Sequence, residues 1–148
     1  MLMKVVMKMS RKLIFNDTVT LFNYVGEVNG VATYAKAILH DVKFVTKRGR
    51  STSGTGSTPD NSATLYIFDT KARVTDVENK CKTYLTPEAY ERSDNPYPFF
   101  TFRSGKDFVV NGVCEADSPK MVESYRITLA SRNTSGTRRM YHWRCDCR

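Results

Sequence analysis

The sequence has few of the residues from which catalytic and metal sites are built. Its 148 residues include only two histidines, and neither His40 nor His142 adjoins a serine or cysteine in a nucleophile motif such as Gly-x-Ser-x-Gly. It also lacks a phosphate-binding Gly-x-x-x-x-Gly-Lys-Ser/Thr loop, a His-Glu-x-x-His zinc helix and a Gly-x-Gly-x-x-Gly turn between a strand and a helix. We therefore predict a protein that is not an enzyme and needs no cofactor.

Cysteine is also scarce. Four cysteines in a chain of this length are too few for a disulfide-rich secreted scaffold, which indicates a reducing compartment such as the cytoplasm. Cys145 and Cys147 lie near His142, but a Cys-x-Cys pair does not have the two-to-four-residue spacing typical of structural zinc. Buried or tolerated thiols are the favoured interpretation, and zinc the alternative.

Long apolar runs are missing. No stretch approaches the roughly 18 apolar residues of a membrane-spanning helix. The first residues are apolar and basic, but Lys4 and Lys8 interrupt them before the core of a signal peptide accumulates. We expect neither a membrane span nor a secretion signal.

Positive charge is the main compositional excess. The formal net charge is +8, and the basic residues concentrate in residues 1–17, 43–50 and 120–148. Clustered cations favour a phosphate-rich or acidic partner, such as DNA or an acidic protein ring. The alternative is a solubilising surface without a particular partner.

The pattern of the chain predicts a mainly β protein. Residues 18–24 are β-branched and aromatic, and Gly26, Asn29 and Gly30 supply a turn before a second extended run over residues 32–46, which is long enough to need a bulge or bend near His40. A strand over residues 63–68 places Leu65 and Ile67 on one face. Further strands are expected over residues 122–131 and 138–145.

Two shorter features complete the expected fold. Thr86 can cap a short helix that begins at Pro87, and residues 99–110 read as a second hairpin. About seven short strands with one helix indicate a single small β-barrel or sandwich. The predicted organisation is a basic N-terminal arm over residues 1–15 and a β-barrel domain over residues 16–148.

Residues 47–62 carry the most specific functional expectation. They contain no apolar side chain and three glycines, so we predict a long flexible loop, on which Lys47, Arg48 and Arg50 face DNA or a partner. The alternative is a disordered excursion without a role.

The aromatic residues offer a different class of function. Tyr97, Phe99, Phe100 and Phe102 could stack on bases in a nucleic-acid-binding barrel, with Arg138 and Arg139 completing the binding face. Core packing is the favoured interpretation of this alternation.

Four segments of the chain resemble the head-completion or stopper proteins in the neck of tailed bacteriophages. They are residues 16–24 (NDTVTLFNY), 63–68 (ATLYIF), 102–112 (FRSGKDFVVNG) and 125–136 (YRITLASRNTSG).

The resemblance implies a structural β-barrel that assembles as a ring between the portal or adaptor proteins and the tail terminator or tail-tube proteins. The ring would help to retain packaged double-stranded DNA, with residues 47–62 reaching into the channel. The implied location is the virion neck, assembled in the cytoplasm of the host bacterium. Tail terminators and adaptor proteins remain alternatives within this group.

The basic N-terminal arm and the Cys-Asp-Cys ending fall outside the family pattern. Val5, Val6, Met7 and Met9 have no evident local partner, and we expect the arm to fold on a neighbouring subunit of the ring.

Overall fold

The computed structural model describes residues 15–53 and 56–148. Among these residues, no helix has the length and apolar character needed to cross a membrane. The elements in chain order are β1 (Asp17–Val28), β2 (Val31–Ser53), β3 (Gly56–Phe68), β4 (Arg73–Thr75), β5 (Thr83–Tyr84), α2 (Pro87–Arg92), β6 (Phe99–Phe100), β7 (Phe108–Asn111), the 3-10 turn η1 (Pro119–Met121), β8 (Tyr125–Asn133), the 3-10 turn η2 (Arg138–Met140) and β9 (His142–Cys147).

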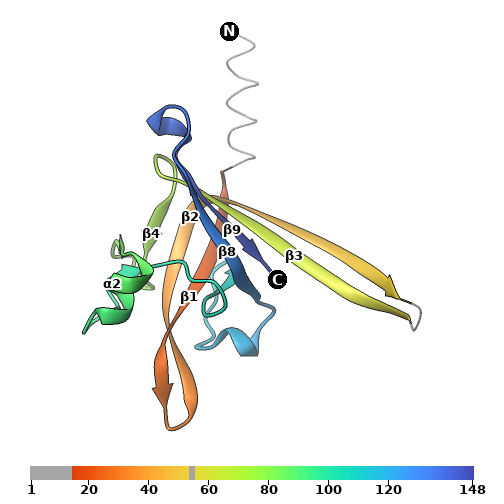
Figure 1. Cartoon of the computed structure of the whole chain (residues 1–148). Helices are drawn as coiled ribbons and strands as arrows, with labels where there is room; N and C mark the ends of the chain where they lie inside the picture. Colours follow the sequence, from red (N-terminus) through yellow and green to blue (C-terminus); the bar gives the residue numbers. More distant parts are fainter. Residues whose placement is uncertain (1–14, 54–55) are drawn as a thin grey trace.

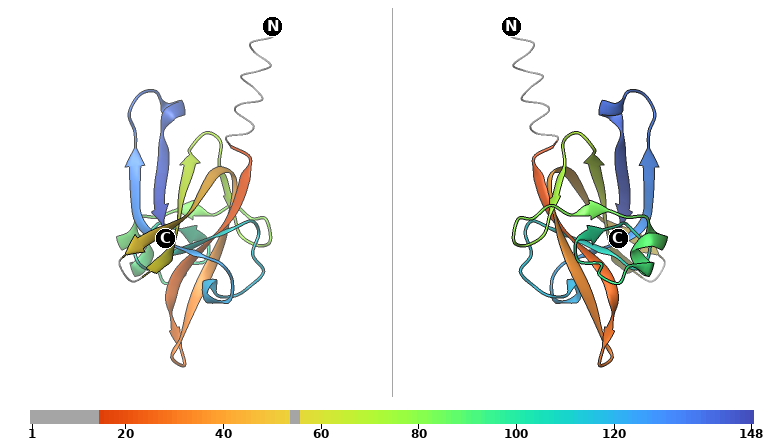
Figure 2. Two further views of the ribbon diagram at one scale, coloured as in Figure 1. Left: turned by 90° about the vertical axis from the view of Figure 1, so that its right-hand side faces the viewer. Right: turned by 90° about the vertical axis from the view of Figure 1, so that its left-hand side faces the viewer.

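One antiparallel sheet wraps into a barrel-like ring (Figure 1). Its seven strands follow the order β1-β7-β8-β9-β3-β2-β4, and β1 also pairs with β2, so the order returns to its starting strand. Three hairpins, β1–β2, β2–β3 and β8–β9, extend from the barrel in different directions (Figures 1 and 2). The prediction of a mainly β, barrel-like fold with one short helix is confirmed.

Local signals predicted the β1–β2 hairpin correctly. Asn29 and Gly30 form its two-residue turn, both with positive φ (54° and 78°), as Asn-Gly turns prefer. The expected bend near His40 is also present, because the register of β1 with β2 shifts between Leu39 and Val42, and Asp41 adopts a left-handed φ of 58°.

The core fills the inside of the ring. Leu65 and Ile67 share one face of β3, as predicted, and that face points into the core, as do Cys145 and Cys147 of β9. The cysteines therefore act as small apolar core residues. Most other buried apolar members of this core come from β1, β2, β7 and β8, namely Val19, Leu21, Ala37, Leu39, Val42, Val109, Tyr125 and Ile127.

The hairpin predicted over residues 99–110 does not form. β6 pairs in parallel with β5, whereas β7 pairs with β1 and β8. The side chain of Asn23 takes the place of a strand partner, because its amide nitrogen donates to the Thr101 carbonyl (2.7 Å) and its oxygen accepts from the Thr101 N–H (3.2 Å). This contact joins residues 78 positions apart and has no local sequence signal.

Residues 47–62 are paired rather than looped. β2 and β3 continue through this segment as an antiparallel ladder, from the Lys47–Ser62 pair to the Ser53–Gly56 pair. Composition suggested a loop because the segment has no apolar side chains, but the ladder is extended from strands whose inner ends are fixed in the core. Its β-branched threonines are compatible with strands.

The predicted start is correct for helix α2 and wrong for the last strand. Helix α2 begins at Pro87 with Thr86 as its cap, as predicted, since the Thr86 hydroxyl accepts from the Ala89 N–H at 3.3 Å. The last strand, expected to begin at Arg138, begins at His142, because Arg138–Met140 form a 3-10 turn.

Candidate functional site

The most prominent surface feature is a two-stranded arm, defined here as residues 47–53 of β2 and 56–62 of β3. It projects away from the barrel, as the pair of long ribbons to the right of Figure 1 shows. Seven residue pairs connect its strands. Among the described residues no third strand pairs with it, since β9 meets β3 only from Ala63 onward. Within the described part of the chain, both edges of the arm therefore lack a neighbouring strand.

The predicted basic site lies on this arm. Lys47 is exposed and its backbone pairs with Ser62. Arg48 and Arg50 follow along β2, where their backbones pair with Asn61 and Pro59. The structure thus brings all three residues to the base and middle of one projecting ribbon. Val5, Val6, Met7 and Met9 of the predicted N-terminal arm lie outside the described residues.

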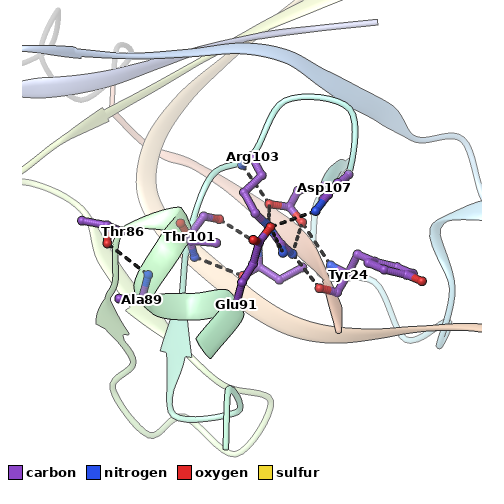
Figure 3. A network of polar contacts seen from close by, with 9 residues as sticks. Tyr24, Thr86, Ala89, Glu91, Thr101, Arg103 and Asp107 are labelled. Atoms are coloured by element: carbon purple, nitrogen blue, oxygen red, sulfur yellow. Dashed lines mark hydrogen bonds and ion pairs between the residues drawn. The ribbon is translucent and has the colours of Figure 1, made fainter. Parts of the chain in front are cut away.

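A buried ion pair stiffens the barrel on the side of α2 (Figure 3). Asp107 is fully buried and accepts hydrogen bonds from the Arg103 guanidinium at 2.8 and 3.1 Å, from the Arg103 N–H at 2.8 Å and from the Tyr24 N–H at 3.0 Å. Burial raises the pKa of Asp107, and the bonds from Arg103 oppose that rise.

Arg103 connects this pair to its surroundings. Its guanidinium donates to the Tyr24 carbonyl at 2.6 Å, lies 3.7 Å from the Glu91 carboxylate, and covers the ring of Tyr90. The network therefore ties β1, α2 and the β6–β7 loop together. The polar groups of Arg103 and Asp107 satisfy one another inside the protein, so the pair contributes to holding the barrel in one arrangement.

The aromatic residues considered for base stacking divide into two groups. Phe100 and Phe102 are buried in the barrel core, 8% and 3% exposed, and contact Tyr84. Phe99 is half-buried and Tyr97 is exposed. The favoured interpretation, core packing, is confirmed for Phe100 and Phe102. Arg138 and Arg139 are exposed on the distant β8–β9 hairpin.

A groove that sequence reasoning missed runs along one edge of β2. It has a volume of about 720 Å³ and contains four of the ten large apolar side chains that are exposed on the described surface. We call it the edge groove, and its lining is Val31, Ala32, Thr33, Tyr34, Ala35, Lys36, Asp76, Val77, Glu78, Lys82, Tyr97, Asp117, Ser118 and Met121.

Two lysines line the wall of the edge groove. The Lys82 ammonium donates to the Lys36 carbonyl at 2.8 Å, and burial lowers the pKa of Lys82 to about 8. The Lys36 ammonium donates to the carbonyls of Cys114 and Ala116, both at 3.2 Å. Both cations are therefore engaged with backbone oxygens.

The histidines and cysteines are dispersed. His40 shares a hydrogen bond of 2.9 Å with the Thr75 hydroxyl, and burial lowers its pKa. His142 contacts the Met140 carbonyl. Cys81 is exposed, whereas the other three thiols are buried and unpaired. In residues 15–53 and 56–148, no three His, Cys, Asp or Glu side chains are grouped so as to hold a metal ion.

Comparison with known proteins gives a family without a function. The family described as "Family of unknown function (DUF6751)" matches residues 14–148. The chain belongs to this DUF6751 family. No curated protein and no solved structure matches this DUF6751 member significantly. The match begins next to Phe15, so the barrel and the β2–β3 arm together are the part shared with the family.

Proposed function

We propose that the protein is a structural connector in the neck of a tailed bacteriophage. In this proposal it assembles as a ring between the portal or adaptor and the tail, and helps to retain packaged DNA. The observation that carries the proposal is the β2–β3 arm, a polar ribbon that projects from the barrel-like ring and meets no third strand among the described residues.

The arm has the properties of a partner-binding element. An isolated two-stranded ribbon is marginally stable in water, and its open edges offer backbone groups to another strand. Lys47, Arg48 and Arg50 place positive charge on it, which suits packaged DNA or an acidic face of a neighbour. In a ring, each such contact is repeated in every subunit, so modest interfaces hold the assembly together.

The barrel gives the arm a rigid base. β2 enters the ring without interruption, and its residues 31–42 pair with β1. The Arg103–Asp107 network fixes β1 in turn, through Tyr24. A stiff base with a projecting ribbon supports a role in assembly, because the conformational entropy lost on binding is then confined to the ribbon.

Cryo-electron microscopy of DNA-filled tailed particles tests this proposal. We expect ring density between portal and tail that fits the barrel, with the arm directed into the channel or onto an adjacent subunit. Fully occupied necks without this chain would refute the connector role. Density at the tail end or directly on the portal would instead identify a tail terminator or an adaptor.

A free nucleic-acid-binding barrel is the remaining rival. It loses two of its stacking candidates, because Phe100 and Phe102 are buried. The exposed Arg138 and Arg139 still favour some contact with phosphates. Tight binding of DNA by the isolated monomer, with a steep dependence on salt and a loss in Arg138→Ser/Arg139→Ser, would favour this rival over the connector.

A further inference from the structure

The edge groove lies beside an edge of β2 that has no strand partner over residues 32–36 in the described part of the chain. On the side of β2 away from β1, β4 pairs only with Ile38–His40. The Lys36 carbonyl, which follows on that edge, is taken by Lys82. Backbone groups alternate between the two edges of a strand, so Ala32 and Tyr34 direct their N–H and C=O groups to the same edge as Lys36. At this edge, no strand among the described residues pairs with Ala32 or Tyr34, whose β1 partners lie at the opposite edge.

Apolar side chains surround this open edge. Val31, Val77, Tyr97 and Met121 line the groove and are 66%, 62%, 60% and 74% exposed. Such clustering of exposed apolar surface marks an interaction site. An open edge next to apolar pockets is the arrangement by which a protein accepts an added strand, since backbone bonds give affinity and the pockets select alternate side chains.

The charge around the groove indicates the occupant. Asp76, Glu78 and Asp117 contribute three carboxylates and the lysines Lys36 and Lys82 two positive charges, so the lining carries a net charge of −1. Glu78 also lies 3.8 Å from the ammonium of Lys80. The groove therefore lacks the positive charge of the chain as a whole, which is +8. It therefore suits an extended segment that is apolar on one face and basic on the other.

The N-terminal segment of the chain has this pattern. Met3, Val5, Met7 and Met9 alternate with Lys4, Val6 and Lys8, so that a strand would present an apolar face and a mostly basic one. We propose that the edge groove binds this segment from a second copy of the chain, as an added strand beside β2.

A second copy fits better than the same copy. Residues 5–9 precede Phe15 by at most ten residues, or about 35 Å of extended chain. Val31 pairs with Val28 at the far end of β1, whose 12 residues span about 40 Å. The segment of the same copy would also need to reverse direction, so it falls short of the outer groove. The inference rests on the self-assembly that the proposed connector requires.

Disulfide trapping between full-length copies tests the inference. One copy carries Met7→Cys and the other Val77→Cys, both with Cys81→Ser to remove the native exposed thiol. Docking holds the two thiols at an effective concentration near the millimolar range, so at micromolar protein we expect a linked dimer on the order of 10³-fold faster than without docking. Leu129→Cys, also exposed but outside the groove, replaces Val77→Cys as the matched control.

A second pair of variants separates the two faces of the segment. Met7→Asp places charge on the apolar face and should abolish self-association, whereas Val6→Asp on the opposite face should weaken it much less. Equal effects of the two variants would overturn the strand arrangement.

Two trapping results would overturn the inference as a whole. One is a Met7–Val77 link no faster than the Leu129 control. The other is a link that closes within one chain when Met7→Cys and Val77→Cys are combined at high dilution. Both are measured on purified protein, so they are independent of the neck proposal. If the disulfide forms but phage necks lack this chain, only the connector proposal is refuted. If the necks contain this chain but the disulfide does not form, only the binding of the N-terminal segment in the edge groove is refuted.

Discussion

Replacing Asp107 with alanine should strongly destabilise the barrel. The substitution removes a fully buried carboxylate that accepts hydrogen bonds from Arg103 and Tyr24, and it leaves the Arg103 guanidinium, 7% exposed, without its main counter-charge. Removing one partner of a buried ion pair costs about 3–5 kcal/mol. Because Arg103 keeps the Tyr24 carbonyl and lies near Glu91, we expect the lower part of this range, about 3 kcal/mol.

The loss is measurable as a shift in unfolding. For a domain of this size, about 3 kcal/mol corresponds to a fall in Tm of about 10 °C. Urea denaturation followed by circular dichroism should show a lower midpoint at an unchanged slope. Asp69→Ala is the matched control, because Asp69 also binds an arginine, Arg132, through both carboxylate oxygens, but at a partly exposed site. Its expected cost is at most about 1 kcal/mol.

A double variant separates the cost of the unpaired buried guanidinium from the cost of lost packing. In Arg103→Met/Asp107→Ala the unpaired guanidinium is gone, so we expect the two single losses to be clearly non-additive. If Asp107→Ala costs no more than Asp69→Ala, or if the two single losses simply add, the network does not stabilise the barrel in the way that its geometry indicates.

Three further predictions concern the arm, the thiols and His40. Replacing residues 48–61 by Asn-Gly should leave the barrel's Tm within about 3 °C, because the arm contributes no apolar core. The same change should remove the proposed ring assembly, as measured by size-exclusion chromatography; a large fall in Tm would contradict this prediction. A thiol reagent should label Cys81 rapidly in native protein and Cys145 and Cys147 only after unfolding, since burial raises the pKa of Cys145 and brings that of Cys147 to about 12; rapid labelling of more than one thiol would refute this. Burial and the neighbouring Arg73 lower the pKa of His40, so protonation favours the unfolded chain and the free energy of unfolding should fall as pH drops below about 6.5. His40→Gln should flatten this pH dependence. A His40 pKa above the ordinary value, measured by NMR, would contradict the expected direction.

Sequence reasoning succeeded where the signal was local. Asn29-Gly30 determines its own turn, Thr86-Pro87 starts its own helix, and Leu65 and Ile67 share a face by alternation alone. The long run after Ala32 correctly implied a bend near His40, because an unbroken strand of that length does not fit a small barrel.

It failed where partners are distant in the chain. The Asn23 side chain bonds the Thr101 backbone where the expected hairpin is absent, and no local pattern reveals that contact. The edge groove needs residues near 31–36, 76–82 and 117–121 to meet, so it is invisible before folding. Residues 47–62 have the composition of a loop, and only the anchoring of β2 and β3 in the core makes them a ladder.

The continuity of β2 has a mechanical consequence. Because one strand serves both barrel and arm, a pull on the arm does not stretch a linker. It pulls β2 and β3 lengthwise against their barrel neighbours β1 and β9, so that the backbone hydrogen bonds of those two ladders resist together. The left-handed residue Asp41 lies where the strand passes from its β1 neighbour to its β3 neighbour. Strain from a moving partner would therefore reach the barrel wall at that bend, in the same strand that borders the edge groove.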